Sequence, residues 1–468
     1  MIRRIVETLD NRLHAQPFLR GALRKAFPDH WSFMLGEIAL YCFVTLVATG
    51  VFLAFLFTPS MEHVTYDGPY APLRGASMSS AYASVLQISF EAPAGLLVRQ
   101  VHHWAALVFL AAIVVHMCRI FFTGAFRRPR EINWLIGLTL LLLALFNGFT
   151  GYSLPDDLLS GTGLRIAYSV AESVPLVGVA SAYLFFGGAY PSDATSERLF
   201  VTHILIVPAI IAALITLHLA IVWRQKHTQF SGPGRTERNV VGSPLWPNYA
   251  LKSAGLFFFI GAVLVALGAF AQINPVWIYG PYAASSVSAP AQPDWYVGWL
   301  EGALRLAPPI ELHVFGRDIP PVFFPGVLMP LVFFAALYLW PVIERRITGD
   351  RAEHHLLDKP SSVPWRIATG SAAVAFGTVL TLAGSDDVQA AHVGIPVEGL
   401  VTAYQVLVVV APIICWFATF RIAREIAARR EHLKPESDRI ALSRDERGGF
   451  AAQPAGAADP PDLQGARR

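Results

Sequence analysis

The chain alternates long apolar runs with polar segments over 468 residues. A helix that crosses a bilayer needs about 20 mostly apolar residues, and eight runs meet this requirement. The weakest is the seventh, which is rich in small residues, and the sixth contains Pro330, which membrane helices tolerate. The pattern predicts an all-α membrane protein with eight transmembrane helices. The predicted spans are 36–58, 101–122, 133–152, 199–223, 254–272, 322–341, 367–384 and 400–420.

Composition and charge agree with this class. Charged residues make up 15% of the chain, against about 25% in soluble proteins. With eight spans both termini share one side of the membrane, and that side carries 30 of the 36 Lys and Arg residues. Because cytoplasmic loops are rich in Lys and Arg, we expect both termini in the cytoplasm. Residues 1–30 have no short apolar core, so no cleaved signal peptide is expected.

The three cysteines form no CxxC or CxxCH motif. This disfavours a disulfide framework, a zinc ribbon and a covalently attached c-type haem. An iron–sulfur cluster or a c-type haem would therefore have to come from partner subunits.

Five histidines lie inside the predicted spans. An ionisable side chain at bilayer depth is costly and indicates a functional site. His102 and His116 are 14 residues apart in span two, about 3.9 helical turns and about 21 Å, so they share one face near opposite membrane surfaces. His103 points about 100° away from His102, and we assign it the role of a hydrogen-bonded polar residue at a helix interface.

Span four repeats the arrangement. His203 and His218 are 15 residues apart, which leaves them about 60° out of phase on an ideal helix. Pro208 lies between them, and a kink or π-bulge there would restore the phase. Spans two and four run in the same direction, so His102 can face His203 near the outer surface, and His116 can face His218 near the inner one.

Two opposed imidazoles are what a bis-histidine haem iron needs. A single pair offers too few ligands for a closed zinc or copper site. Three alternatives stay open: polar residues at helix interfaces, a transporter or channel with histidine proton relays, and a haem anchor of a dehydrogenase. A reduced-minus-oxidised spectrum separates them.

Four glycines share the 14-residue period of the histidines. They are Gly36 and Gly50 in span one, and Gly137 and Gly151 in span three. Glycine permits the close approach that a flat macrocycle edge requires, although helix packing alone also uses small residues.

Three arginines lie close to the histidines in sequence. Arg99, Arg119 and Arg198 could pair with haem propionates, and the alternative is that their side chains reach the membrane surface.

Several motifs together resemble cytochrome b of quinol-oxidising bc-type complexes, over about residues 28–420. They are RQVHHW (99–104), HMCR (116–119), FRRPRE (126–131), GYSLPDD (151–157), RLFVTH (198–203) and PDWY (293–296). The resemblance implies a four-helix dihaem bundle at 36–230 and a quinol-site domain at 231–420. Residues 1–35 would be a cytoplasmic segment, and the polar residues 421–468 a disordered cytoplasmic tail.

The resemblance also implies roles for single residues. His102 and His203 would bind the lower-potential b haem, and His116 and His218 the higher-potential one. The outer quinol pocket would contain Tyr152 and the segment Pro293, Asp294, Trp295 and Tyr296, in which aspartate replaces the family's glutamate. The segment 158–180 resembles the amphipathic helix over that pocket. For the inner quinone site the candidates are His227 and Ser253, with Ser32 and Lys252 as further ones.

A fused eight-helix chain with these motifs is similar to actinobacterial cytochrome b. This implies a subunit of a quinol–cytochrome c reductase in a bacterial plasma membrane, with two non-covalent b haems, menaquinol as substrate and a proton-translocating Q cycle. The implied partners are a Rieske iron–sulfur protein, a dihaem cytochrome c subunit, a terminal oxidase in a supercomplex and a second copy of the complex. No feature points to nucleic acid.

Overall fold

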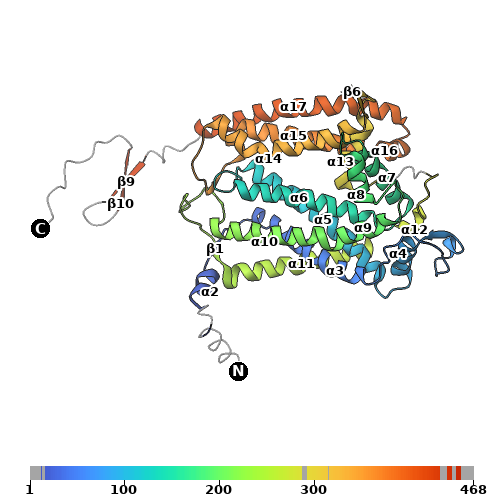
Figure 1. The fold of residues 1–468 in the computed structure, drawn as a ribbon. Helices are drawn as coiled ribbons and strands as arrows, with labels where there is room; N and C mark the ends of the chain where they lie inside the picture. Colours follow the sequence, from blue (N-terminus) through green and yellow to red (C-terminus); the bar gives the residue numbers. More distant parts are fainter. Residues whose placement is uncertain are drawn as a thin grey trace.

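A computed structural model describes residue 12 and residues 16–286, 292–314, 316–432, 440–444 and 450–454. Within this part of the chain, eight helices are long and apolar enough to cross a membrane, which confirms the predicted number (Figure 1). Three of them contain a π-helical turn (η3, η4 and η5) before an α-helix; the other elements labelled η are short 3-10 helices. The eight are α3 (Leu35–Ala54), α5 (Gly95–Phe122), α6 (Glu131–Tyr152), α9–η3–α10 (Ala194–Val201, Thr202–Ile206, Val207–Gln225), η4–α11 (Leu245–Tyr249, Ala250–Phe270), η5–α14 (Phe324–Leu328, Met329–Thr348), α15 (Pro364–Ala383) and α17 (Val397–His432).

Short elements fill the loops between these helices. The short helices are α2 (Gln16–Leu23), η1 (Trp31–Phe33), η2 (Ala71–Leu73), α4 (Ser80–Phe90), α7 (Leu158–Glu172), α8 (Gly178–Phe186), α12 (Val276–Tyr279), α13 (Trp295–Leu306), η6 (Pro360–Ser362) and α16 (Asp386–Val393). Each described strand belongs to a two-stranded sheet. The pairs are β1 (Ala26–Phe27) with β5 (Ser243–Pro244), β2 (His63–Thr65) with β3 (Ser77–Ser79), β4 (Gln229–Phe230) with β8 (Leu356–Leu357), β6 (Leu312–Val314) with β7 (Arg317–Ile319), and β9 (Ile440–Arg444) with β10 (Phe450–Pro454).

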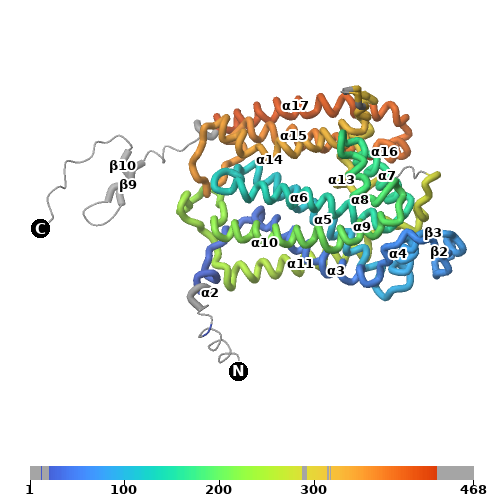
Figure 2. The backbone as a smooth tube through the Cα atoms, viewed as in Figure 1, coloured from blue at the N-terminus to red at the C-terminus, as the bar shows by residue number. Residues whose placement is uncertain are grey.

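The bundle has two parts that meet along α5. In the first part α3 packs along α5, and α6 packs against α10, while α11 covers both α3 and α5. In the second part α13, α15 and α17 pack together (Figure 2). The central core lies where α3, α5, α6 and α11 meet, and Cys42, Ala105, Leu110 and Leu264 are buried there.

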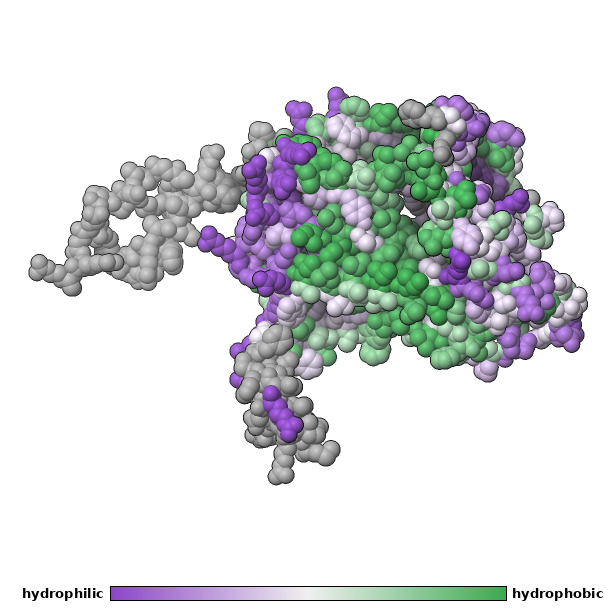
Figure 3. Space-filling view, viewed as in Figure 1, coloured by the Kyte–Doolittle hydropathy of each residue, from purple (hydrophilic) through white to green (hydrophobic). Residues whose placement is uncertain are grey.

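The surface has the polarity of a membrane protein. A broad apolar belt (green in Figure 3) separates two polar ends of the molecule. The loop helices α4, α7, α8, α12 and α16 lie at one end of the bundle, and α2 and β1 lie at the other (Figure 1). The expected amphipathic segment 158–180 forms α7 and the start of α8, at the same end as α4.

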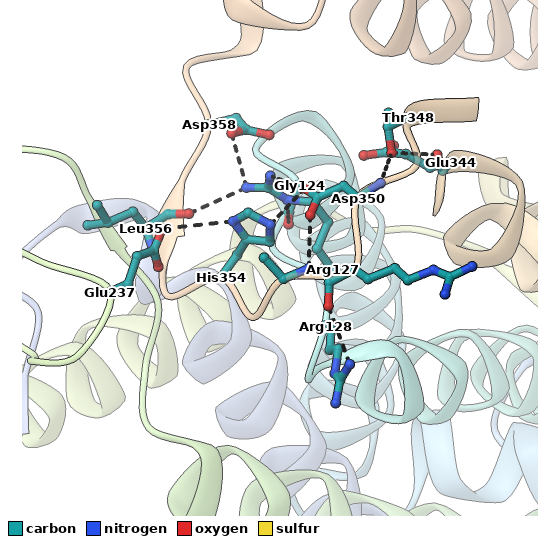
Figure 4. Close-up of polar contacts among 12 residues, drawn as sticks. Gly124, Arg127, Arg128, Glu237, Glu344, Thr348, Asp350, His354, Leu356 and Asp358 are labelled. Atoms are coloured by element: carbon teal, nitrogen blue, oxygen red, sulfur yellow. Dashed lines mark hydrogen bonds and ion pairs between the residues drawn. The ribbon is translucent and has the colours of Figure 1, made fainter. Parts of the chain in front are cut away.

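Charged contacts hold the connecting segments at the end of the bundle that contains β1. Arg127 pairs with Asp358 at 3.0 Å and approaches Asp350 at 4.0 Å. Glu237 accepts a hydrogen bond from the backbone of Leu356 at 2.8 Å, which supports the β4–β8 pairing (Figure 4). Segments 124–130, 226–238 and 349–358 are therefore joined into one polar layer.

The end of the chain differs from the prediction. The last helix continues past residue 420 to His432, because residues 421–432 contain Ala, Arg and Glu, which favour helix. Among the described residues of the predicted tail, β9 pairs with β10. The rest of that tail lies outside the described residues.

Candidate functional site

Four of the five intramembrane histidines form two pairs, each in its own cavity. His102 and His203 line a cavity of about 410 Å³, and His116 and His218 line one of about 320 Å³. We call them the outer and the inner cavity after the membrane side predicted for each. Both lie between α5 and α10, the two helices that carry the histidines.

The phase mismatch in span four is resolved by the backbone. η3 is a π-helical turn over Thr202–Ile206, directly before Pro208. A π turn inserts an extra residue into an α-helix, so the 15-residue spacing brings His203 and His218 to the same side. The predicted π-bulge is therefore confirmed.

Each histidine faces one of the four predicted glycines. A Cβ atom added to Gly50 would lie 3.2 Å from Cε1 of His102, and one added to Gly36 would lie 3.4 Å from Cε1 of His116. A Cβ on Gly151 would lie only 2.3 Å from Cε1 of His203. The glycines thus provide the space in which each imidazole lies.

The fourth glycine is less crowded. A Cβ on Gly137 would lie 3.7 Å from Cε1 of His218, which is an ordinary van der Waals contact. The four glycines therefore differ in how strictly they exclude a side chain.

The two rings of the outer pair lie close together. The ring centroids of His102 and His203 are 6.3 Å apart, which leaves room for one metal ion between two bonds of about 2 Å. Nδ1 of His102 lies 2.8 Å from the hydroxyl of Thr49, and Nδ1 of His203 lies 3.0 Å from the carbonyl oxygen of Asn147. These contacts orient each ring and would leave Nε2 free to bind a metal ion.

The inner pair is buried and less constrained. Nδ1 of His116 and Nδ1 of His218 are buried and have no hydrogen-bond partner in the described structure. An apolar cavity with unpartnered imidazoles and a glycine opposite each ring fits a haem. No group of three or more His, Cys, Asp or Glu side chains that could hold a metal ion occurs among the described residues.

The three candidate arginines differ in their surroundings. Arg99 lines the outer cavity and Arg119 the inner one, and each has a buried guanidinium nitrogen without a partner. Arg198 instead donates hydrogen bonds to the carbonyl oxygens of Tyr183 and Leu184 at 2.8 and 2.6 Å. It is not among the residues that line the outer cavity.

The outer cavity extends from the histidine pair to the start of α13. Tyr152, Asp294 and Tyr296 line it. Pro293 and Trp295 are not among the lining residues, and Trp295 is 42% exposed. Asp294 is the N-cap residue of α13, yet its side chain makes no capping bond. The carboxylate accepts a hydrogen bond from the Tyr296 hydroxyl at 3.1 Å. Burial, together with the charge of this carboxylate, raises the pKa of Tyr296 well above its ordinary value.

His103 makes a polar contact between two helices, which agrees with the role predicted for it at a helix interface. Its Nε2 lies 2.8 Å from Oδ1 of Asp294, and the ring lines the outer cavity. The angle between His103 and His102 did not predict the partner, which lies at the start of α13, 191 residues away in the chain.

The inner cavity brings together the start of α3, the end of α5, the start of α6 and the end of α10. His227 lines it and its Nδ1 is buried without a partner. Burial, together with the positive charges of Lys25, Arg130 and Arg119, lowers the pKa of His227 to about 4. The imidazole is therefore neutral at pH 7.

The other inner-site candidates are not among the residues that line the inner cavity. Ser253 donates a hydrogen bond to Oε2 of Glu37 at 2.7 Å, and Glu37 is the residue that lines the cavity. Lys252 pairs with Asp29 at 2.7 Å, with the lysine side chain 55% exposed. Ser32 lies 2.9 Å from Nδ1 of His30. Sequence reasoning missed Glu37, although an acidic residue in the first turn of a membrane helix is itself a signal.

Comparison with known proteins identifies the family. A family described as "Cytochrome b(N-terminal)/b6/petB" matches residues 107–281. The chain is 52% identical over 422 residues to the cytochrome bc1 complex cytochrome b subunit of Mycobacterium tuberculosis, covering 90% of this chain and 77% of the relative. The same subunit of Streptomyces coelicolor is 47% identical over 427 residues, covering 91% and 78%.

A solved structure supports the fold. A chain of a hyperthermophilic respiratory Complex III superimposes with a TM-score of 0.67 at 22% identity, covering 90% of this chain and 99% of the other. Together with the identities above, this similarity leads to one conclusion: the chain belongs to the family of cytochrome b subunits of cytochrome bc1 complexes.

Proposed function

We propose that the chain binds two b haems between paired histidines and works in a Q cycle. As a member of its family, it is a multi-pass subunit of a bacterial plasma-membrane quinol–cytochrome c reductase, with b-type haem and with Rieske and cytochrome c partners. The observation that carries the proposal is the pairing of four buried histidines in two cavities, each ring opposite a glycine.

His102 and His203 would hold the outer haem, and His116 and His218 the inner one. Arg99 and Arg119 would pair with propionates, because each offers a buried guanidinium nitrogen to its cavity. When bound, the haems would supply one-electron transfer across the membrane. Gly50, Gly151, Gly36 and Gly137 keep side chains out of the space beside the rings.

Quinol oxidation would take place where the outer cavity reaches α13. Asp294 is a carboxylate on an otherwise largely apolar wall, as expected for a group that accepts a proton from a quinol hydroxyl. Tyr296 and His103 hold this carboxylate through hydrogen bonds. Tyr152 lines the same cavity as Asp294 and the His102–His203 pair.

Quinone reduction would take place in the inner cavity, with His227 as a hydrogen-bond partner of the quinone. Ser253 would act through Glu37, because its hydroxyl bonds to that carboxylate. The proposal includes menaquinol as substrate, a dihaem cytochrome c subunit, a supercomplex with a terminal oxidase and a dimeric complex, as the resemblance to actinobacterial relatives implies. It also includes a cytoplasmic position for both termini, a dihaem unit at residues 36–230 and a quinol-site unit at residues 231–420.

The decisive experiment counts and assigns the haems. The purified complex should contain two b haems per chain by pyridine haemochrome assay, besides the haem c of its partner. His116→Ala should remove the higher-potential b haem and leave the lower-potential one. The matched control is His227→Ala, a buried histidine of the same cavity that should keep both. Fewer than two b haems, or loss of the lower-potential signal in His116→Ala, would contradict the proposal.

A further inference from the structure

Glu37 places a carboxylate on the wall of the inner cavity, at the start of α3. Three hydroxyl groups converge on it. Tyr249 donates to Oε1, and Ser253 and Tyr41 donate to Oε2, the last two at 2.7 and 3.1 Å. Tyr249 and Ser253 come from the η4–α11 span and Tyr41 from the next turn of α3, so two helices build one carboxylate site.

The partners of Glu37 are neutral. Among the described residues none makes an ion pair with it, although the inner cavity is also lined by the cations Arg119, Arg130 and Lys226. Burying a carboxylate in a membrane-spanning helix costs free energy unless an opposite charge or hydrogen bonds compensate for the lost water. Hydroxyl groups alone could join α3 to α11, so helix packing does not require an acid here. The acid therefore points to proton chemistry.

The cavity beside Glu37 suits a flat aromatic ring. Phe27 lines it, and the Phe27 ring centroid lies 4.5 Å from the ring of Tyr249 and 4.5 Å from the ring of His227. A ring with an oxygen at each end could thus contact Phe27 while its oxygens reach polar groups of the wall. Glu37 and His227 are two such groups: Glu37 lies at the start of α3, and His227 lies in the segment between α10 and β4.

We infer that Glu37 delivers a proton to the quinone that is reduced in the inner cavity. The inference rests on the proposed quinone-reducing site. Reduction of one quinone takes two electrons, one from each of two quinols oxidised at the outer site, and two protons from the cytoplasm. Glu37 supplies one proton: its carboxyl O–H bond breaks as an O–H bond forms on the quinone oxygen. Water on the cytoplasmic side reprotonates Glu37 and provides the second proton.

An exposed acid lies at the surface on the same side of the bundle as this network. Lys252, the residue before Ser253, pairs with the exposed Asp29, which also accepts a hydrogen bond from Ser243. Asp29 is thus an exposed acid on the same side of the bundle as the carboxylate network. Ser253 and Tyr41 are positioning residues in this scheme, because they bond to the carboxylate and do not line the cavity.

The test uses the whole purified complex with a short-chain menaquinone as the probe. In Glu37→Gln, reoxidation of the inner haem by this quinone should slow by about 10²-fold, as expected when a general acid is removed. Reduction of the haems by quinol at the outer site should be unchanged. Glu131→Gln is the matched control, since it makes the same change in the first turn of α6, outside the inner cavity.

A second readout does not depend on turnover. An infrared difference spectrum between quinone-loaded and quinone-free complex should contain a carboxyl C=O band that is absent in Glu37→Gln and present in Glu131→Gln. If Glu37→Gln does not assemble, Glu37→Asp replaces it and should shift the band and slow reoxidation.

The outcomes separate this inference from the proposed function. Wild-type reoxidation and an unchanged carboxyl band in the Glu37 variants would overturn the role of Glu37 alone. If quinone fails to reoxidise the inner haem in the wild-type complex, the proposed quinone-reducing site itself is wrong.

Discussion

The imidazole Nε2 of His103 lies 2.8 Å from Oδ1 and 3.0 Å from Oδ2 of Asp294. This contact joins α5 to the start of α13, and both side chains are about 15% exposed. It fixes the carboxylate on the wall of the outer cavity, beside the hydroxyl of Tyr296. A residue next to a proposed haem ligand thus positions the proposed proton acceptor.

Replacing His103 should impair quinol oxidation without loss of haem. In His103→Phe the carboxylate loses its imidazole partner, and a misplaced catalytic group can lower the rate by about 10²-fold. We expect kcat/KM for quinol to fall by about 10- to 100-fold while the b-haem spectrum stays normal. Trp104 is the next residue of α5, and its side chain donates a hydrogen bond to the carbonyl oxygen of Ala271. Trp104→Phe removes that bond and should have a much smaller effect. Wild-type kcat/KM in His103→Phe would show that the contact is not needed.

The glycines opposite the histidines should differ in tolerance. Gly151→Ala places a Cβ 2.3 Å from Cε1 of His203, so the ring must move, and we expect loss of the outer b haem. Gly137→Ala makes an ordinary contact of 3.7 Å with His218, so the inner haem should stay bound. Redox difference spectra of the two variants measure this. Equal haem content in both would contradict the argument from crowding.

Much of this fold could be predicted from the sequence, because membrane spans and histidine spacing are local patterns. The eight spans follow from apolar runs of sufficient length. The π turn in η3 follows from the mismatch between 15 residues and the helical period, together with Pro208. The match of Gly36, Gly50, Gly137 and Gly151 to the four histidines also follows from a shared period.

The contacts of the polar groups could not be predicted in the same way. His103 meets Asp294 across 191 residues, and Glu37 meets Ser253 across 216, so no local period connects them. Which face of α5 meets α13 depends on how the two halves of the molecule pack. The sequence could have singled out Glu37 as an acid in a membrane helix, but not its three hydroxyl partners.

Breaking one buried ion pair should destabilise the protein. Arg366 and Glu344 form a salt bridge with side chains 3% and 4% exposed, and Arg366 also bonds Asp358 at 2.7 Å. Removing one partner leaves a buried charge, at a cost of about 3–5 kcal/mol. Arg366→Met should therefore lower the melting temperature of the complex markedly.

Two further variants test the cause of that loss. Glu344→Met combined with Arg366→Met should recover part of the stability, since no lone charge remains buried at position 344. Arg345→Met, at an exposed neighbouring position, should melt like the wild type. A double variant that is no more stable than Arg366→Met would argue against the buried-charge explanation.

Stability should also depend on pH through Asp157, the N-cap residue of α7. Burial raises the pKa of its carboxyl from 3.8 to about 6, although hydrogen bonds from Ser160 and the backbone of Leu159 oppose the shift. Between about pH 4 and pH 6 the folded protein keeps a proton that the unfolded chain has released. Stability from this group is therefore lost as the pH rises through that range, by about 3 kcal/mol at most.

Asp157→Asn should remove this dependence, because the amide stays neutral and still caps the helix. We expect the variant to melt like the wild type near pH 4 and at a higher temperature above pH 6. Thermal melting of the purified complex across this range measures the difference, and Asp193→Asn, an exposed residue at the start of α9, is the control. Parallel melting curves for Asp157→Asn and the wild type would show that this carboxyl titrates alike in the folded and unfolded chain.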